Sequence, residues 1–117
     1  MANWTIKSAL REYDRKYRKD EGNPAKRKID RIILSLYILG ENGRKNVSQQ
    51  DIERKAAISK KEIIPAIEES MEKGWIIDSS TMSGMKWTLN RKGIIYAEEI
   101  IETLESVENR FYLTEME

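Results

Sequence analysis

Residues 48–93, SQQDIERKAAISKKEIIPAIEESMEKGWIIDSSTMSGMKWTLNRKG, decide the fold of this chain. Ser48 is a suitable N-cap for a first short helix, and Ser59 is expected to cap a second helix at residues 59–73 that ends before a glycine. Residues 75–77 and 86–89 are rich in β-branched and aromatic side chains, a composition that is typical of strands. The stretch therefore predicts a helix, a turn, a second helix and a β-hairpin.

Two features of this stretch depart from regular patterns. Pro65 falls within the second helix, where it removes a backbone hydrogen bond, so the helix should bend there or begin later. The polar loop at residues 78–85 is longer than a tight turn and should project. Met82 and Met85 are unusual at a solvated tip, and they could press into a minor groove, contact a protein partner or fold back onto the domain.

Three amphipathic patterns add longer helices around this stretch. An apolar stripe and a basic stripe run side by side along residues 4–19, and residues 25–39 carry the broad apolar face of a central helix. Gly40 is expected to end that central helix in the left-handed conformation. Asn90 is expected to cap a last helix that runs towards Phe111.

The predicted fold class is therefore mainly α with a small β-hairpin (α+β). We divide the chain into a basic amphipathic N-terminal helix at residues 1–22, a helix-turn-helix domain with its hairpin at residues 25–93, and an acidic C-terminal helix at residues 94–117. At 117 residues the chain has the length of one domain with an additional helix at each end.

Composition excludes several chemical functions. The chain has no cysteine and no histidine, which removes disulfides, thiolate and imidazole metal ligands, and the commonest nucleophiles and general bases. We therefore predict no enzymatic activity, no catalytic residues, no metal and no cofactor. Neither a secretory signal nor an apolar run of membrane-spanning length is visible, so we expect a cytoplasmic protein without a membrane partner.

Charge is uneven along the chain although the net charge is only +1. Residues 1–31 hold ten Lys or Arg against five Asp or Glu, whereas residues 93–117 hold one arginine against seven glutamates. Such asymmetry predicts a surface that faces anions and an acidic end that is held away from it.

Two segments of the central stretch follow a recurrent pattern. Residues 67–76, IEESMEKGWI, end a helix in a Lys-Gly-hydrophobic-Ile step, and residues 87–93, WTLNRKG, leave the hairpin through a Leu-x-x-Lys-Gly step. Together with the Ser-Lys-Lys start of helix 59–73, they resemble the core of winged helix-turn-helix DNA-binding proteins, such as the MarR-like families and archaeal and viral regulators. The resemblance implies a transcriptional regulator that reads duplex DNA with helix 59–73 and a wing at residues 78–86.

The candidate DNA contacts form three groups. Lysines and glutamines at helix starts would meet phosphates or base edges with the help of the helix dipole. Hydroxyls of the wing can donate to phosphate oxygens, and the N-terminal basic stripe can neutralise phosphates. The candidates are Gln49, Gln50, Ser59, Lys60 and Lys61 at the helix starts, Ser80, Thr81 and Lys86 in the wing, and Lys7, Arg11, Arg15, Arg18, Lys26, Arg27 and Lys28 in the N-terminal part.

For each group the alternative is an ordinary solvated surface. Glutamates dominate the rest of helix 59–73, so only its first turn could approach a phosphate. The same architecture also serves modules that bind other proteins. The rival hypothesis is therefore a winged-helix protein–protein interaction module that does not bind DNA.

The C-terminal helix carries a seam at three- and four-residue steps that is typical of coiled coils. A homodimer along this seam would place two recognition helices about 34 Å apart, the spacing of successive major grooves. The alternative is packing of the seam against the chain's own domain. The expected partners are thus double-stranded DNA and a second copy, and no particular small-molecule effector is indicated. The predicted seam residues are Ala97, Ile101, Leu104, Val107 and Phe111.

Overall fold

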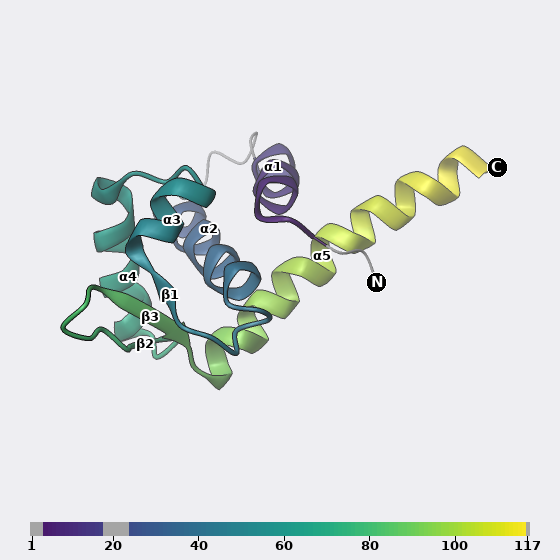
Figure 1. Ribbon diagram of the computed structural model, residues 1–117. Coiled ribbons are helices and arrows are strands. Elements are labelled where there is room, and N and C mark those ends of the chain that lie inside the picture. The colour runs from purple at the N-terminus through teal and green to yellow at the C-terminus, as the bar shows by residue number, and fades with distance from the viewer. Residues whose placement is uncertain (1–3, 18–23, 117) are drawn as a thin grey trace.

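A computed structural model describes residues 4–17 and 24–116, with side chains described for residues 4–16 and 24–105. The fold is mainly helical with a three-stranded antiparallel sheet, and α5 extends away from the side that carries the β2–β3 loop (Figure 1). The elements in chain order are α1 (Ile6–Tyr17), α2 (Pro24–Leu39), β1 (Val47–Ser48), α3 (Gln49–Lys55), α4 (Lys60–Glu72), β2 (Ile76–Asp78), β3 (Lys86–Leu89) and α5 (Arg91–Met116).

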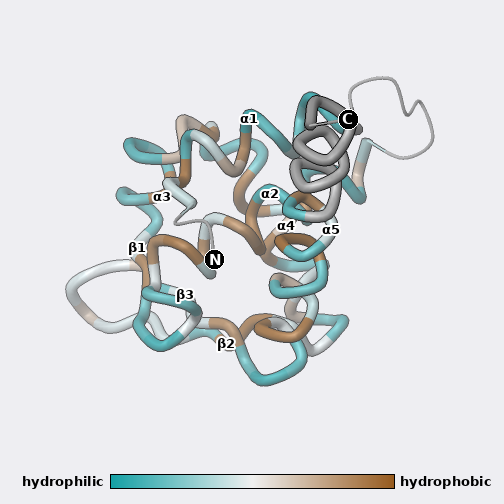
Figure 2. The backbone as a smooth tube through the Cα atoms, turned by 90° about the vertical axis from the view of Figure 1, so that its right-hand side faces the viewer, coloured by the Kyte–Doolittle hydropathy of each residue, from teal (hydrophilic) through white to brown (hydrophobic). Residues whose placement is uncertain are grey.

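Helix α2 is the centre of the core. Ile32, Ile33, Leu34 and Leu36 are each at most 1% exposed, and α1, α4 and α5 all pack against α2. Figure 2 shows the hydrophobic stretches gathered around α2 and α4 in the middle of the molecule. The predicted central helix is confirmed.

The sheet has one more strand than predicted. Its order is β1-β3-β2, so β3 lies in the middle, and Trp87 on β3 pairs with Val47 on one side and with Asp78 on the other. The Trp87 side chain is 1% exposed. The predicted hairpin of β2 and β3 is confirmed. The added strand β1 was not predicted, because its two residues are too few to form a strand pattern and are held by their pairing with β3.

The helix starts follow the predicted caps in two of three cases. The Ser48 hydroxyl accepts a hydrogen bond from the Asp51 N–H at 3.1 Å, and Asn90 Oδ1 accepts one from the Gly93 N–H at 2.9 Å. Ser59 stands at the N-cap position of α4, but its side chain forms no capping bond. Ser48 and Asn90 are therefore confirmed as capping residues.

The expected left-handed conformation of Gly40 was wrong. The next three residues, 41–43, take positive φ angles of 53°, 64° and 81° instead. Gly40 is required for another reason: a Cβ there would lie 2.6 Å from the carbonyl oxygens of both Leu36 and Lys45. The chain turns back at this point, and two carbonyl groups occupy the space of a side chain.

A buried carboxylate joins three helices. Asp30 on α2 is 1% exposed and accepts hydrogen bonds from the hydroxyls of Tyr13 on α1 and Tyr96 on α5. The Lys26 ammonium, one turn earlier on α2, lies 3.1 Å from the same carboxylate. The Tyr96 ring in turn stacks on Trp75, with ring centroids 4.2 Å apart. This network holds α1 and α5 against α2.

Gly93, in the first turn of α5, is expected to tolerate no side chain. A Cβ there would lie 2.1 Å from the carbonyl oxygen of Trp75, a backbone atom that cannot move aside without disturbing β2. Gly93→Ala should therefore lower the free energy of unfolding by about 1–3 kcal/mol, although alanine is the better helix former. Urea denaturation measures this change. Lys92→Ala, at the exposed neighbouring position, should shift stability by less than about 0.5 kcal/mol, and equal effects of the two variants would contradict the clash.

Candidate nucleic-acid interface

Helix α4 buries one face and presents the other to solvent. Ile63, Ala66, Ile67 and Ser70 form the buried face, and the Ser70 hydroxyl donates to the Ala66 carbonyl oxygen at 2.7 Å. The hydroxyl of Ser70 therefore costs little in the core, because it is satisfied within its own helix. Pro65 lies on the exposed face, and the helix begins at Lys60 as predicted rather than after the proline.

The first turn of α4 is its only cationic part. Lys60 and Lys61 are exposed and form no ion pair with any residue in the described ranges. The free N–H groups and the dipole of this helix end add partial positive charge. The remaining exposed face is acidic, so an anion can approach only at this end. The exposed acidic residues are Glu62, Glu68, Glu69 and Glu72.

The two glutamines at the start of α3 lie in different environments. The backbone N–H of Gln49 donates to the Met85 carbonyl oxygen at 3.1 Å, and its side-chain Oε1 is buried without a hydrogen-bond partner among the described residues. Gln50 is exposed. Of the pair, Gln50 is free to meet a ligand, whereas Gln49 joins α3 to the base of the β2–β3 loop.

The β2–β3 loop is ordered by its own hydroxyl groups. The Ser80 hydroxyl accepts from the Lys86 N–H at 3.0 Å, and the hydroxyls of Thr81 and Ser83 are 2.7 Å apart. Thr81 and Gly84 exchange two backbone hydrogen bonds of 3.1 Å at the tip. Two predicted phosphate donors, Ser80 and Thr81, are thus used inside the loop.

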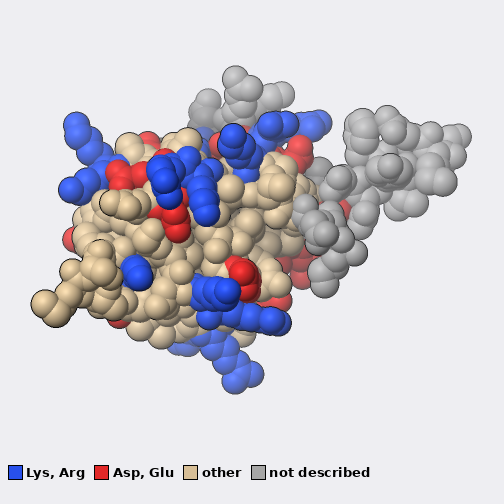
Figure 3. Space-filling model, in the orientation of Figure 1, with Lys and Arg blue, Asp and Glu red and all other residues tan. Residues whose placement is uncertain are grey.

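Large apolar side chains are exposed on this hairpin, and residues 79–85 of its loop include no cation. Met82 is fully exposed at 108%, and Met85 and Ile77 are about half exposed at 48% and 50%. Hydrogen bonds from Ser80 keep the pKa of Asp78 below its usual value, so the base of the loop stays anionic. Figure 3 shows the loop as an uncharged projection at the lower left. The half-buried Lys86 on β3 is the nearest cation in the sequence.

The basic residues near the N-terminus separate into different environments. Lys7 and Lys28 are exposed, Lys26 bonds to Asp30, and Arg18 lies outside the described residues. On the face drawn in Figure 3, Lys and Arg form several groups with Asp and Glu between some of them. The expected single cationic front is not present on this face.

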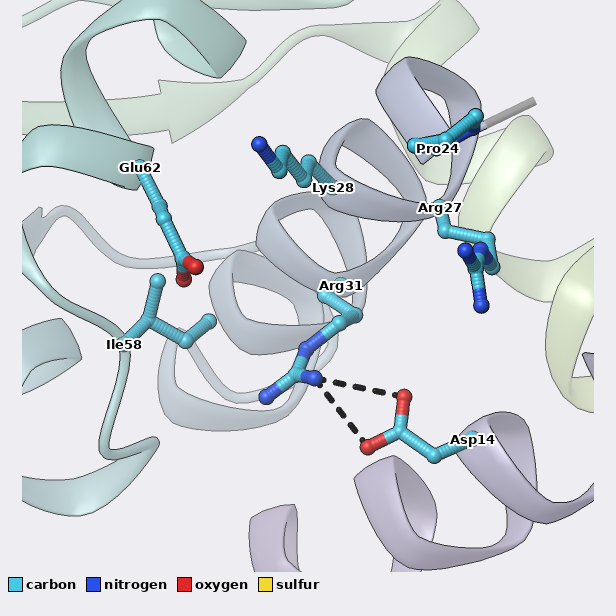
Figure 4. A pocket seen from close by; sticks show the side chains of 7 residues that line it. All are labelled: Asp14, Pro24, Arg27, Lys28, Arg31, Ile58 and Glu62. Atoms are coloured by element: carbon cyan, nitrogen blue, oxygen red, sulfur yellow. Dashed lines mark hydrogen bonds and ion pairs between the residues drawn. The ribbon is translucent and has the colours of Figure 1, made fainter. Parts of the chain in front are cut away.

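Four arginines from α1 and α2 line one cavity together with Asp14. Arg31 Nη1 lies 3.1 Å and 3.3 Å from the two carboxylate oxygens of Asp14 (Figure 4). We name this group the arginine cleft, because its members line a cavity of about 560 Å³. It consists of Arg11, Asp14, Arg15, Arg27 and Arg31.

The sequence interpretation missed two members of the arginine cleft, Asp14 and Arg31. A signal for Arg31 was available, because it follows Arg27 by four residues and so lies on the same helix face. Nothing in the sequence indicated that α1 contributes to the same site. Only the packing of α1 on α2 brings Arg11, Asp14 and Arg15 of α1 opposite Arg27 and Arg31 of α2.

The predicted dimer seam on α5 is partly covered by the chain itself. Ala97 and Leu104 are 0% and 3% exposed because α5 packs against α1 and α2. Ile101 is half-buried, and Val107 and Phe111 lie outside the part whose side chains are described. Ala97 and Leu104 therefore belong to the core of the single chain, and the homodimer stays a prediction.

The helix-turn-helix of α3 and α4, with the β2–β3 hairpin beside it, defines a winged-helix protein. The fold is similar to that in the crystal structure of overoxidized AbfR bound to DNA, with a TM-score of 0.53 and 17% sequence identity. That match covers 92% of this chain and 77% of the AbfR chain. No protein-family model matches the sequence, and no curated protein matches it. The predicted winged helix-turn-helix fold is confirmed.

Within the described part of the chain, no three His, Cys, Asp or Glu side chains lie together as a metal site requires. No helix in the same ranges has the length and apolar character needed to cross a membrane.

Proposed function

We propose that this protein is a DNA-binding transcriptional regulator that contacts duplex DNA with the first turn of α4 and with the wing, the β2–β3 loop. The observation that carries the proposal is the pair of exposed lysines, Lys60 and Lys61, at the start of the helix that the winged-helix fold presents to solvent. In Figure 1 the wing and α4 lie on the same side of the molecule, opposite the extended end of α5.

Charge on α4 determines how such a contact would form. Two ammonium groups and the helix end attract phosphates, whereas Glu68 and Glu72 further along repel them. The helix would therefore meet DNA with its N-terminal end, assisted by Gln50 at the start of α3. The similarity to AbfR, whose crystal structure contains DNA, supports the same general use of this fold.

Binding to duplex DNA of random sequence at low salt tests the proposal. Fluorescence anisotropy should show association at micromolar protein, and the affinity should fall steeply as salt is added, because phosphate contacts release counterions. A 30-residue helical peptide of the same net charge serves as a control for unspecific attraction. Anisotropy that stays flat at micromolar protein would exclude the proposed function.

The wing supports a second candidate, a module that binds another protein. Met82 and Met85 in the wing and Ile77 on the adjoining β2 are exposed apolar side chains, and Asp78 at the base of the wing is anionic. Apolar side chains without cations suit a protein partner better than a phosphate backbone. Substituting Met82 and Met85 with serine tests the part of the wing in DNA binding, because DNA affinity changes only if these side chains reach a groove.

A further inference from the structure

The arginine cleft contains donors that the protein itself does not use. Arg27 Nε and Arg31 Nε are both buried, and neither has a hydrogen-bond partner among the described residues. Buried N–H groups of charged side chains are strongly destabilising when they stay unpaired. The cleft is therefore incomplete as a purely structural arrangement.

Charge in the cleft is not balanced. Four guanidinium groups line the cleft against two carboxylates, that of Asp14, which is engaged with Arg31, and that of Glu12, which lies 3.6 Å from Arg15. A smaller adjoining cavity of about 170 Å³ shares Asp14, Arg27 and Arg31 and is bordered by Lys28 and Glu62. In Figure 4 these two border residues lie on the far side of Arg31 from Asp14. Lys28 and Glu62 carry opposite charges, so the excess of positive charge stays with the arginines.

We propose that the arginine cleft binds a small phosphate-bearing anion. Guanidinium groups bind phosphate through paired N–H donors, and a phosphate group offers enough acceptor oxygens for donors from two helices at once. Even the smaller adjoining cavity, at about 170 Å³, has room for such a group, since a water molecule takes about 30 Å³.

The position of the donors favours a small solute over the DNA backbone. Both unpaired Nε atoms are buried, so an anion has to enter between α1 and α2 to bond with them, which a small solute does more readily than a phosphate held on a DNA duplex. A free solute can enter the cavity between α1 and α2 and satisfy them. The site is thus separate from the lysines at the start of α4, although Glu62 of α4 borders the adjoining cavity.

Titration of the full chain with inorganic phosphate, in a buffer of low chloride without DNA, tests this site by calorimetry. Arg27→Gln should weaken phosphate binding by about tenfold or more, because it removes a charged donor group. Arg44→Gln removes an exposed charge beyond the opposite end of α2 and should leave the affinity unchanged. Absence of saturable binding, or equal affinity of the two variants, would overturn the proposal.

A second variant distinguishes loss of the binding site from loss of binding through misfolding. Asp14→Asn removes the carboxylate that competes for Arg31, so phosphate should bind several-fold more tightly, a gain that damage to the fold cannot produce. Unchanged or weaker binding in Asp14→Asn would contradict the proposed position of the anion.

A separate measurement of DNA binding tests whether the cleft takes a small phosphate-bearing solute or a phosphate of the DNA backbone. Arg27→Gln and Arg44→Gln should bind random duplex DNA equally well if the cleft takes a small solute. A selective loss of DNA affinity in Arg27→Gln would assign the cleft to the DNA backbone and overturn the small-anion proposal. The phosphate titration contains no DNA, so failure of the proposed DNA binding leaves its outcome unaffected.

Discussion

Asp30→Ala is expected to lower the free energy of unfolding by about 3–5 kcal/mol, because hydrogen bonds to a charged group contribute about 1.5–3 kcal/mol each. Two such bonds come from the hydroxyls of Tyr13 and Tyr96, on two different helices. Tyr13 is 1% exposed, so its hydroxyl would lose a buried acceptor. Urea denaturation followed by circular dichroism measures the loss.

Two further substitutions locate the cause of that loss. Asp30→Asn keeps the shape and one acceptor oxygen but not the charge, so its effect should be smaller than that of alanine. Glu98→Ala removes an exposed carboxylate from α5 and should cost less than about 0.5 kcal/mol. If Asp30→Ala were no more harmful than Glu98→Ala, the carboxylate would not hold the three helices together.

Joint replacement of Lys60 and Lys61 by alanine is expected to reduce affinity for duplex DNA at low salt by tenfold or more, a loss of about 1.4 kcal/mol. If both ammonium groups neutralise phosphates, the slope of log affinity against log salt should become shallower by about two units. Anisotropy titrations at four or five salt concentrations give both quantities from one set of measurements.

The control for this variant removes the same charge elsewhere. Arg44→Ala with Lys45→Ala eliminates two exposed cations from the turn that follows α2, beyond the core and away from the start of α4. Long-range attraction falls equally in both double variants, so the difference between them isolates local contact. If the slope of log affinity against log salt were the same in both double variants, Lys60 and Lys61 would not contact the DNA.

Local patterns in the sequence predicted those parts of the fold that local forces determine. Ser48 and Asn90 were identified as caps because a short polar side chain at a helix start satisfies a nearby backbone N–H. The β1 strand was missed because its two residues pair only with the distant β3. Gly40 was misinterpreted for a similar reason, since the atoms that exclude a side chain include the carbonyl of Lys45 after the turn.

The candidate site divides in the same way. The lysines of α4 could be predicted from the sequence as exposed, because they precede the apolar pattern of that helix. The arginine cleft and the buried Asp30 could not, because both depend on how α1 lies against α2. The wing has several hydroxyl groups, but those of Ser80, Thr81 and Ser83 already form hydrogen bonds within the loop. Their number in the sequence therefore does not tell how many are available to a ligand.

The stacking of Trp75 on Tyr96 provides this chain with a built-in optical probe. The indole of Trp75 is half-buried at the junction of the hairpin and α5, while that of Trp87 lies in the core. Release of Trp75 from the phenol ring would change its emission, so loosening at that junction can be followed by intrinsic fluorescence without any label.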